Sequence, residues 1–359
     1  MESRRNFGLD ILRSAAILMV ITSHLLLAIH DIGIYGVELF FVLSGFLIGG
    51  ILIRSVNRAG LFTFADLKTF WMRRWFRTLP NYFWFLLLYL LLYLFVIGTD
   101  ATSLQLASYG VFMQNFAWSI YPFATHTWSL TIEEWFYLSF PLAFYFYARG
   151  ATGRDDLLRK FLRTVLFFLV FPALLRFSEP LWLGYSDART VVICRLDAIM
   201  YGVLFAWLKT NQRHWRVAGK LWPLGIVGLA ASVLFIRDSA HWSQAIAFTL
   251  IPQSFALILP VFNRLHSARG LLAAGIQRIS IWSYSMYLCH MLVYTVAMRL
   301  THYETLSPLG QIAVKCLSLA GIFAISALNY HFFEHPATNL RDRFDKQSEA
   351  EPEPVILLT

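Results

Sequence analysis

The amino-acid sequence predicts an all-α, polytopic membrane protein. Of its 359 residues, 58% are hydrophobic and only 14% are charged, whereas an ordinary soluble domain carries roughly 25% charged residues. A soluble fold could not cover its surface with so few charged side chains. The apolar residues form runs long enough to span a bilayer, and basic residues gather between alternate runs. These observations exclude a soluble enzyme, a disordered chain and a secreted disulfide scaffold.

A spanning helix needs about 20 mostly apolar residues, with a range of roughly 17 to 25. The first run follows Arg4 and Arg5 but has no small-residue cleavage site after it, so we expect a retained helix and not a signal peptide. The run 164–177 is short, and we expect it to extend into the preceding basic segment. The ten candidate spans are residues 9–29, 34–53, 80–98, 127–148, 164–177, 191–208, 221–236, 245–262, 280–298 and 311–333.

The basic residues predict the orientation, because short cytoplasmic loops accumulate Lys and Arg. Basic groups follow the second, fourth, sixth and eighth candidate spans and recur in the C-terminal tail. Ten crossings with both termini in the cytoplasm fit this alternation. Residues 103–122 are semi-apolar, and counting them as one crossing would invert every later loop, so we expect a re-entrant or outer-surface segment there. We therefore divide the chain into a transmembrane domain, 1–337, and a short charged cytoplasmic tail, 338–359.

The net charge of +9 does not indicate a nucleic-acid partner, because the basic residues lie in short segments between apolar runs. Such a distribution is typical of a protein whose partner is the lipid bilayer. The three cysteines lie inside apolar stretches without metal-ligand spacing. We therefore expect no metal site.

The first span carries three ionisable residues, Asp10, Arg13 and His24. Such groups are costly in a bilayer and by default mark function or a paired contact. Arg13 and His24 are eleven residues apart, close to three helical turns, so they project from one face with about 16 Å of rise between them. Asp10 and Arg13 are three residues apart and can pair along the helix. We predict a polar cavity from near the inner surface toward the outer half of the membrane; a packing role for His24 is the alternative.

The second span begins near Glu38 in GVELFFVLSGF, where Ser44-Gly45 permits a close helix approach or a kink. Gly49 and Gly50 follow, and packing alone explains them.

An arginine cluster follows the second span in FWMRRWFRTLP. Arg74 and Arg77 are neighbours on one helical face, Arg73 lies beside them, and Pro80 is expected to begin the next helix. The cluster is either a solvated anchor at the inner surface or a clamp for phosphates, which guanidinium groups bind bidentately.

Further polar groups lie within later spans. The segment HTWSLTIEEWFYLSFP carries Glu133 and Glu134 into the apolar region, near the depth of His24. Arg195 and Asp197 are two residues apart, so they cannot face each other on a helix and should pair with other helices. The remaining groups are Tyr287 and His290, which share a face, and Glu334 and His335, which are expected to cap the last helix or pair with basic loops.

This ordered set resembles the acyltransferase 3 family of integral membrane O-acyltransferases. The resemblance runs from residue 7 to about 337, essentially the whole chain, and one departure is Glu38, where the family often has Asp. The matching features are Arg13-x10-His24, GVELFFVLSGF, Arg74-x-x-Arg77 before Pro80, WSLTIEEWFY, Arg195-x-Asp197, YSMYLCH ending in His290, and FFEHP.

The resemblance implies transfer of an acetyl group from cytoplasmic acetyl-CoA to a hydroxyl of an extracytoplasmic or lipid-linked glycan, in the bacterial inner membrane. It also implies that His24 is the central catalytic residue and that Arg13, Arg74 and Arg77 contact the acyl-CoA donor. Some members carry a fused extracytoplasmic hydrolase-like domain. The chain of 359 residues leaves no room for one, so we expect direct acylation of the acceptor or transfer through a separate protein.

The chemistry of the residues agrees with this implication. Coenzyme A is anionic and cytosolic, and Arg73, Arg74 and Arg77 are expected on the inner side, with Arg13 just inside the membrane. A pantetheine arm could then pass along the first helix to His24, which acts either as general base for a sugar hydroxyl or as an acyl carrier.

Other polar residues are assigned supporting roles. We expect Glu133 to orient His24, with Glu134 or Glu38 as alternatives, and Arg195 or Tyr287 to stabilise an oxyanion. The full set of expected substrate or support residues is Asp10, Glu38, Ser44, Glu134, Arg195, Asp197, Tyr287 and His290.

A transporter or flippase for a glycan or a small anionic substrate is the alternative function. It would also need a polar path through the bundle. However, many transporters show pseudo-symmetry between their halves, and this sequence has no internal repeat. The arginine cluster also fits a coenzyme A donor better.

Overall fold

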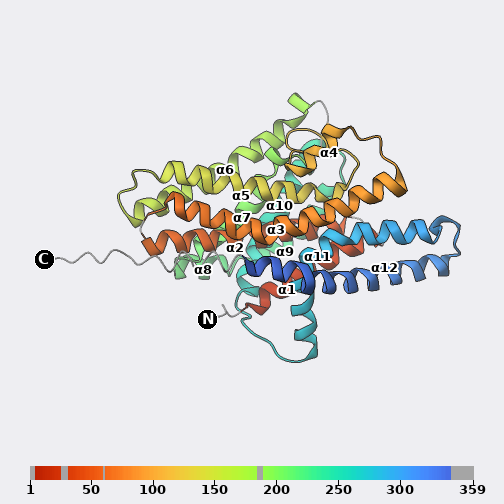
Figure 1. Ribbon diagram of the computed structural model, residues 1–359. Helices are drawn as coiled ribbons and strands as arrows, with labels where there is room; N and C mark the ends of the chain where they lie inside the picture. Colours follow the sequence, from red (N-terminus) through yellow and green to blue (C-terminus); the bar gives the residue numbers. More distant parts are fainter. Residues whose placement is uncertain (1–4, 26–30, 60, 184–188, 341–359) are drawn as a thin grey trace.

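A computed structural model gives the protein as a bundle of α-helices (Figure 1). The structure describes residues 5–25, 31–59, 61–183 and 189–340. No β-strand occurs among these residues, which confirms the all-α prediction. Both chain ends and most of the predicted charged tail lie outside the described residues, so the cytoplasmic placement of the termini stays a prediction.

Six of the described helices are long and apolar enough to cross a membrane, namely α1, α2, α3, α6, α10 and α12, and a seventh span results if α8 and α9, which meet at 44°, are counted as one. The spans expected at 127–148, 191–208 and 280–298 correspond to α5, α7 and α11, of which α7 has only 13 residues. The helices are α1 (Phe7–Leu25), α2 (Ile32–Ala59), α3 (Phe64–Leu92), α4 (Ser103–Gly110), α5 (Trp128–Ala148), α6 (Arg154–Leu183), α7 (Leu196–Leu208), α8 (Gln212–Ala218), α9 (Trp222–Arg237), α10 (His241–Phe262), α11 (Leu271–Leu300) and α12 (Pro308–Asn329).

Helix α3 differs from its expected span, because it begins at Phe64 and continues through Pro80. The expectation that Pro80 begins a helix is therefore wrong. Thr63 caps the helix reciprocally with Asp66, whose carboxylate accepts from the Thr63 amide at 2.8 Å. Neighbouring helices compensate a proline inside a membrane helix. As a consequence the arginine cluster lies on a helix within the bundle, and not in a loop.

Residues 103–122 do not form a crossing helix. Only the eight residues of α4 are helical, and irregular chain follows them. The hydroxyl of Tyr82 donates to the carbonyl of Tyr109 at 2.8 Å, and the indole of Trp135 donates to the carbonyl of Phe112 at 2.7 Å. The segment thus folds against α3 and α5, near the end of the bundle where α3 finishes (Figure 1). The absence of a crossing helix in this described segment is confirmed, and its re-entrant or outer-surface placement stays a prediction.

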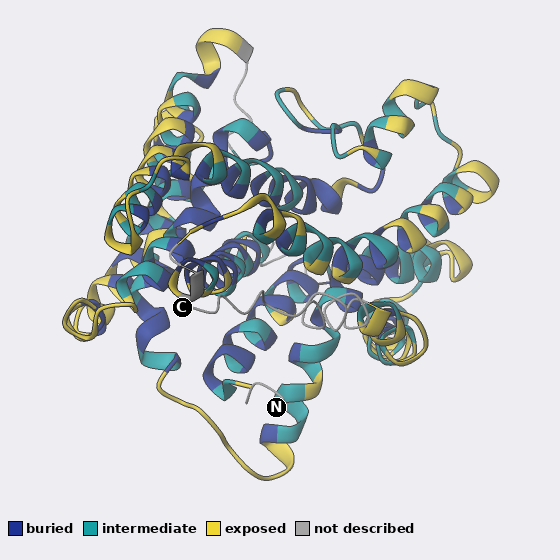
Figure 2. Ribbon diagram, turned by 60° about the vertical axis from the view of Figure 1, so that its left-hand side comes forward, coloured by how far each residue is buried: buried dark blue, intermediate teal, exposed yellow. Residues whose placement is uncertain are grey.

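The core is centred on α2, which packs closely on α7. A Cβ atom at Gly45 would lie 1.9 Å from the carbonyl oxygen of Ile199, and one at Gly202 would lie 2.0 Å from that of Val42. Only glycine permits this approach of the two backbones. Figure 2 shows the buried residues gathered along the facing sides of the helices, with exposed residues on the outer sides and in the loops.

Two buried ion pairs cross the same core. Arg176 of α6 donates two hydrogen bonds of 2.8 Å to the carboxylate of Asp197, and Arg195, just before α7, pairs with Glu38 of α2. All four side chains are fully buried. The expectation that Arg195 and Asp197 pair with other helices is confirmed. Two cations and two anions together leave this group formally neutral.

Candidate active site

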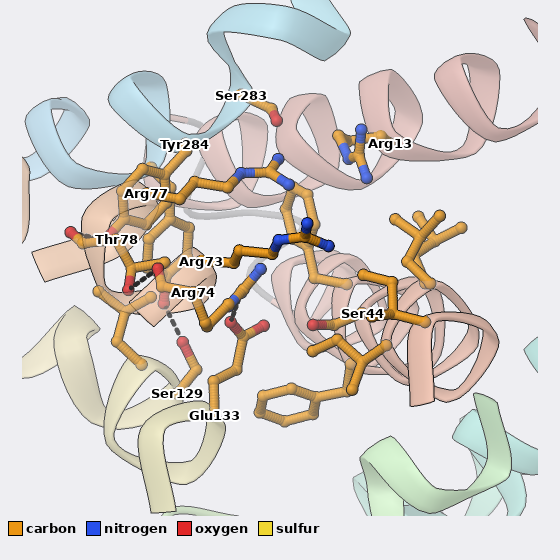
Figure 3. A pocket seen from close by; sticks show the side chains of 18 of the residues that line it. Arg13, Ser44, Arg73, Arg74, Arg77, Thr78, Ser129, Glu133, Ser283 and Tyr284 are labelled. Atoms are coloured by element: carbon orange, nitrogen blue, oxygen red, sulfur yellow. Dashed lines mark hydrogen bonds and ion pairs between the residues drawn. The ribbon is translucent and has the colours of Figure 1, made fainter. Parts of the chain in front are cut away.

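Two adjoining cavities lie inside the bundle. The larger, which we call the arginine cavity, has a volume of about 460 Å³ and lies between α1, α2, α3, α5 and α11 (Figure 3). Its polar and charged lining residues are Arg13, Ser44, Arg54, Arg73, Arg74, Arg77, Thr78, Ser129, Glu133, Ser283, Tyr284 and Tyr287. Arg73 and Arg77 are exposed, and Arg74 lies deeper, with an 18% exposed side chain.

The arginine cavity is strongly cationic, because five arginines line it and, among the described residues, Glu133 is the one carboxylate in its lining. Arg74 is held in place by its neighbours: it donates to the Glu133 carboxylate at 3.2 Å and also to the hydroxyl of Tyr137. Tyr137 in turn donates to Glu133 at 2.8 Å and bonds the hydroxyl of Ser44 at 2.5 Å. The structure therefore places Glu133 and Ser44 with the arginine cluster.

Arg13 points into the same cavity and makes no hydrogen bond with the described residues (Figure 3). The expected pairing of Asp10 with Arg13 is wrong. Asp10 instead accepts from Arg5 at 2.5 Å and from Ser280 at 2.7 Å. These partners, one before the helix and one on α11, satisfy the carboxylate and leave the Arg13 guanidinium directed at the cavity.

Glu134 faces α3 beside the arginine cavity without lining it. It accepts from the hydroxyl of Thr78 at 2.9 Å, while the carbonyl of Thr78 accepts from the hydroxyl of Tyr284, also at 2.9 Å. Glu134 therefore holds α3 against α5 and does not reach His24.

The smaller cavity, which we call the histidine cavity, has a volume of about 130 Å³ and is lined by His24, His126 and Arg189 among others. Val37 and Tyr287 line both cavities. The predicted single path from Arg13 to His24 is therefore wrong: each residue lines its own cavity, and the two cavities share a wall. Two hydrogen bonds fix the Tyr287 hydroxyl in this wall. One joins it to the hydroxyl of Ser129 at 2.6 Å, and the other is donated to the carbonyl of His126 at 2.5 Å.

Three histidines gather at the histidine cavity. The ring centroids of His24 and His290 are 5.1 Å apart, and those of His126 and His290 are 5.4 Å apart. The shared face of Tyr287 and His290 is confirmed by a ring separation of 5.7 Å. Sequence reasoning missed His126, although it is the first residue of the HTWSLTIEEWF segment. The expectation that Glu133 orients His24 is not met, since Glu133 lies in the arginine cavity.

Several other expected site residues line neither cavity. Glu38 and Arg195 pair with each other, so neither is placed to tune His24 or to bind an oxyanion. Glu334 does not cap a helix end as expected: it is buried and accepts from Ser285 at 2.5 Å and from Asn81 at 3.2 Å. These residues join helices together.

Within the part of the chain that the structure describes, no group of three or more His, Cys, Asp or Glu residues could hold a metal ion. The histidine cluster offers nitrogen atoms for proton transfer or acyl transfer, and the arginine cavity offers cations for an anionic ligand.

Comparison with known proteins identifies the family. The acyltransferase domain of the acyltransferase 3 family matches residues 6–327. The O-acetyltransferase OatA of Staphylococcus aureus (strain NCTC 8325 / PS 47) is 27% identical over 361 residues, covering 92% of this chain and 56% of that protein. A protein of Staphylococcus aureus (strain COL) named "Putative O-acetyltransferase" is 26% identical over 368 residues, with the same coverage. The chain thus spans about half the length of these relatives. No solved structure matches it.

Proposed function

The chain belongs to the acyltransferase 3 family of membrane acyltransferases, and from this premise we propose that it is a multi-pass O-acetyltransferase of the bacterial inner membrane. In this proposal it moves an acetyl group from cytoplasmic acetyl-CoA to a hydroxyl of an extracytoplasmic or lipid-linked glycan. The names of the similar proteins support O-acetyl transfer.

The observation that carries the proposal is the pairing of an arginine cavity with a histidine cavity across one shared wall. Coenzyme A carries phosphates on its nucleotide end, and guanidinium groups bind phosphates bidentately. Exposed Arg73 and Arg77 would receive the nucleotide, and Arg13 would contact a phosphate deeper in the cavity. Arg74, already fixed by Glu133, would contribute a preorganised cation.

The histidine cavity is the proposed acceptor site. A hydroxyl bound there would lose its proton to His24 as its oxygen attacks the thioester carbonyl. The carbon–sulfur bond then breaks, coenzyme A leaves as the thiolate, and the proton held by His24 neutralises it. A transient acyl group on His24 is a second route through the same geometry. In both routes the thioester must reach His24, so the wall formed by Val37 and Tyr287 has to open.

The decisive experiment uses the purified protein in nanodiscs with radiolabelled acetyl-CoA and a panel of bacterial surface glycans. We expect the wild type to label one acceptor and His24→Ala to abolish labelling while coenzyme A still binds. His331→Ala, which changes an exposed histidine outside both cavities, should behave as wild type. If the label never leaves coenzyme A while a glycan crosses a vesicle membrane, the protein is a transporter instead.

A further inference from the structure

Arg189 lies in the wall of the histidine cavity, a few residues before α7. Among the described lining residues of this cavity, Arg189 is the one Lys or Arg, and none is Asp or Glu. Arg189 forms no hydrogen bond or ion pair with another described residue. The described lining of the histidine cavity therefore carries a positive charge without a carboxylate to balance it.

The one contact of Arg189 among the described residues leaves its hydrogen-bond donors available. Its guanidinium carbon lies over the ring of Trp128, 5.7 Å from the centroid. A guanidinium group has five N–H donors in its plane, and contact with an aromatic face uses none of them. Trp128 is itself held in place, because its ring packs edge-on against Phe41 at 6.1 Å and its carbonyl accepts from Asn115 at 3.1 Å. Arg189 is thus a supported cation whose donors suit a carboxylate or a phosphate.

The backbone beside Arg189 is fixed to the irregular chain that follows α4. The carbonyl of Thr190 accepts from the side-chain amide of Asn115 at 2.5 Å. The backbone amides of residues 192–193 donate to the carbonyls of residues 115–116 at 3.0 and 3.3 Å. Segments far apart in the sequence therefore build this wall together.

Two further lining residues, Thr190 and His126, carry polar atoms without a hydrogen-bond partner among the described residues. These atoms are Oγ1 of Thr190 and Nε2 of His126. Both residues are buried, with exposed fractions of 4% and 7%, and both line the histidine cavity. Buried polar atoms without a partner are rare, and each requires an explanation. A polar ligand in the histidine cavity supplies one.

We propose that Arg189 and Thr190 bind an anionic group of the acceptor, a carboxylate or a phosphate carried near the hydroxyl that is acetylated. This inference rests on the proposed function and names the class of acceptor. The histidine cavity is small, about 130 Å³, and is lined by both His24 and Arg189, so one bound sugar can meet both residues. The guanidinium group holds the anion bidentately, Thr190 donates from its hydroxyl, and the sugar hydroxyl lies toward His24. Acidic glycans are then the preferred acceptors and neutral glycans are poor ones.

Calorimetric titration in nanodiscs tests this preference without turnover. The probes are methyl glucoside, methyl glucuronide and glucose 1-phosphate, and saturating coenzyme A keeps the arginine cavity occupied. We expect the wild type to bind at least one anionic probe about 10- to 100-fold more tightly than methyl glucoside, as a hydrogen bond to a charged group predicts. The preferred probe shows whether the anion is a carboxylate or a phosphate. Equal affinity for all three probes overturns the inference.

Substitutions locate the preference at Arg189. Arg189→Gln should remove it, Arg189→Lys should keep part of it because the charge remains without the planar fork, and Thr190→Val should weaken it less than Arg189→Gln does. Arg299→Gln, which changes an exposed arginine outside both cavities, should keep the wild-type preference. Thermal unfolding is recorded for each variant, and if Arg189→Gln does not fold, Arg189→Lys and Thr190→Val decide. An unchanged preference in the folded Arg189 variants overturns the inference.

Acetyl transfer from labelled acetyl-CoA to the same probes separates recognition from catalysis. We expect Arg189→Gln to lower the ratio of kcat/KM for the anionic probe to kcat/KM for the neutral probe about 10- to 100-fold, mainly through KM. An equal loss for both probes, carried by kcat, would place Arg189 on the oxyanion of the reaction and overturn anion recognition. A wild type that binds the anionic probe but transfers no acetyl group overturns the proposed function and leaves the anion site standing.

Discussion

Replacing Arg13 by Gln should separate donor affinity from protein stability. The Arg13 guanidinium makes no hydrogen bond with the described residues and points into the arginine cavity. Its nearest charges include Arg77 and Arg74, which repel it, and Asp10, whose oxygen atoms are already used by Arg5 and Ser280. The substitution therefore removes repulsion inside the protein and no hydrogen bond among the described residues.

The expected loss lies in binding. A hydrogen bond to a charged group contributes about 1.5–3 kcal/mol. Loss of one such bond to a coenzyme A phosphate would therefore weaken binding about 10- to 150-fold. The thermal midpoint should stay equal or rise, because repulsion between like charges has been reduced.

The assay combines calorimetric titration of coenzyme A with thermal unfolding of the same nanodisc sample. Arg74→Gln is the contrasting variant: it breaks the bonds to Glu133 and Tyr137, so it should lower both affinity and midpoint. Arg299→Gln, at the exposed end of α11, is the control. The reasoning is refuted if Arg13→Gln binds coenzyme A as wild type does and unfolds as early as Arg74→Gln.

Three further substitutions test the rest of the structure. Glu38→Ala leaves Arg195 buried and unpaired and should cost about 3–5 kcal/mol in the free energy of unfolding; a wild-type unfolding curve would contradict the buried pair. Gly202→Ala places a Cβ atom 2.0 Å from a carbonyl oxygen of α2 and should lower the free energy of unfolding by about 1–3 kcal/mol. The control is Gly275→Ala, which has open space around it and should leave the free energy of unfolding unchanged. Equal losses of stability in the two variants would refute the close packing of α2 and α7. Tyr287→Phe removes the hydrogen bonds that fix the wall between the two cavities. Hydrolysis of acetyl-CoA in the absence of an acceptor should therefore rise relative to acetyl transfer. An unchanged ratio of hydrolysis to transfer would mean that these hydrogen bonds do not close the wall.

Local pattern predicted most of the helices. Apolar runs of the required length identified them, and the basic residues before the run 164–177 joined α6 as expected. The prediction that Pro80 begins a helix was wrong because a short stretch of sequence cannot show that neighbouring helices support α3 through the proline. The expectation that Arg13 lines a polar cavity is confirmed, since Arg13 lines the arginine cavity.

Contacts between distant segments were beyond such reasoning. Arg13 and His24 share a helix, but Val37 and Tyr287, from two other helices, divide the space between them into two cavities. Glu38 and Arg195 are 157 residues apart in the chain, so no local spacing could pair them and both looked like site residues. Sequence reasoning missed His126 because it lies just before α5, and only the folded structure shows that its ring lies close to the ring of His290.

The salt-linked pair in the core also constrains how the protein is made. During translation Glu38 is added to the chain long before Arg195, because the two residues are 157 positions apart. An unpaired carboxylate in hydrocarbon costs several kcal/mol, so α2 enters lipid less favourably while that group is ionised and unpaired. This cost favours shelter of the early segment by protein, or protonation of its acid, until the later half emerges from the translocon.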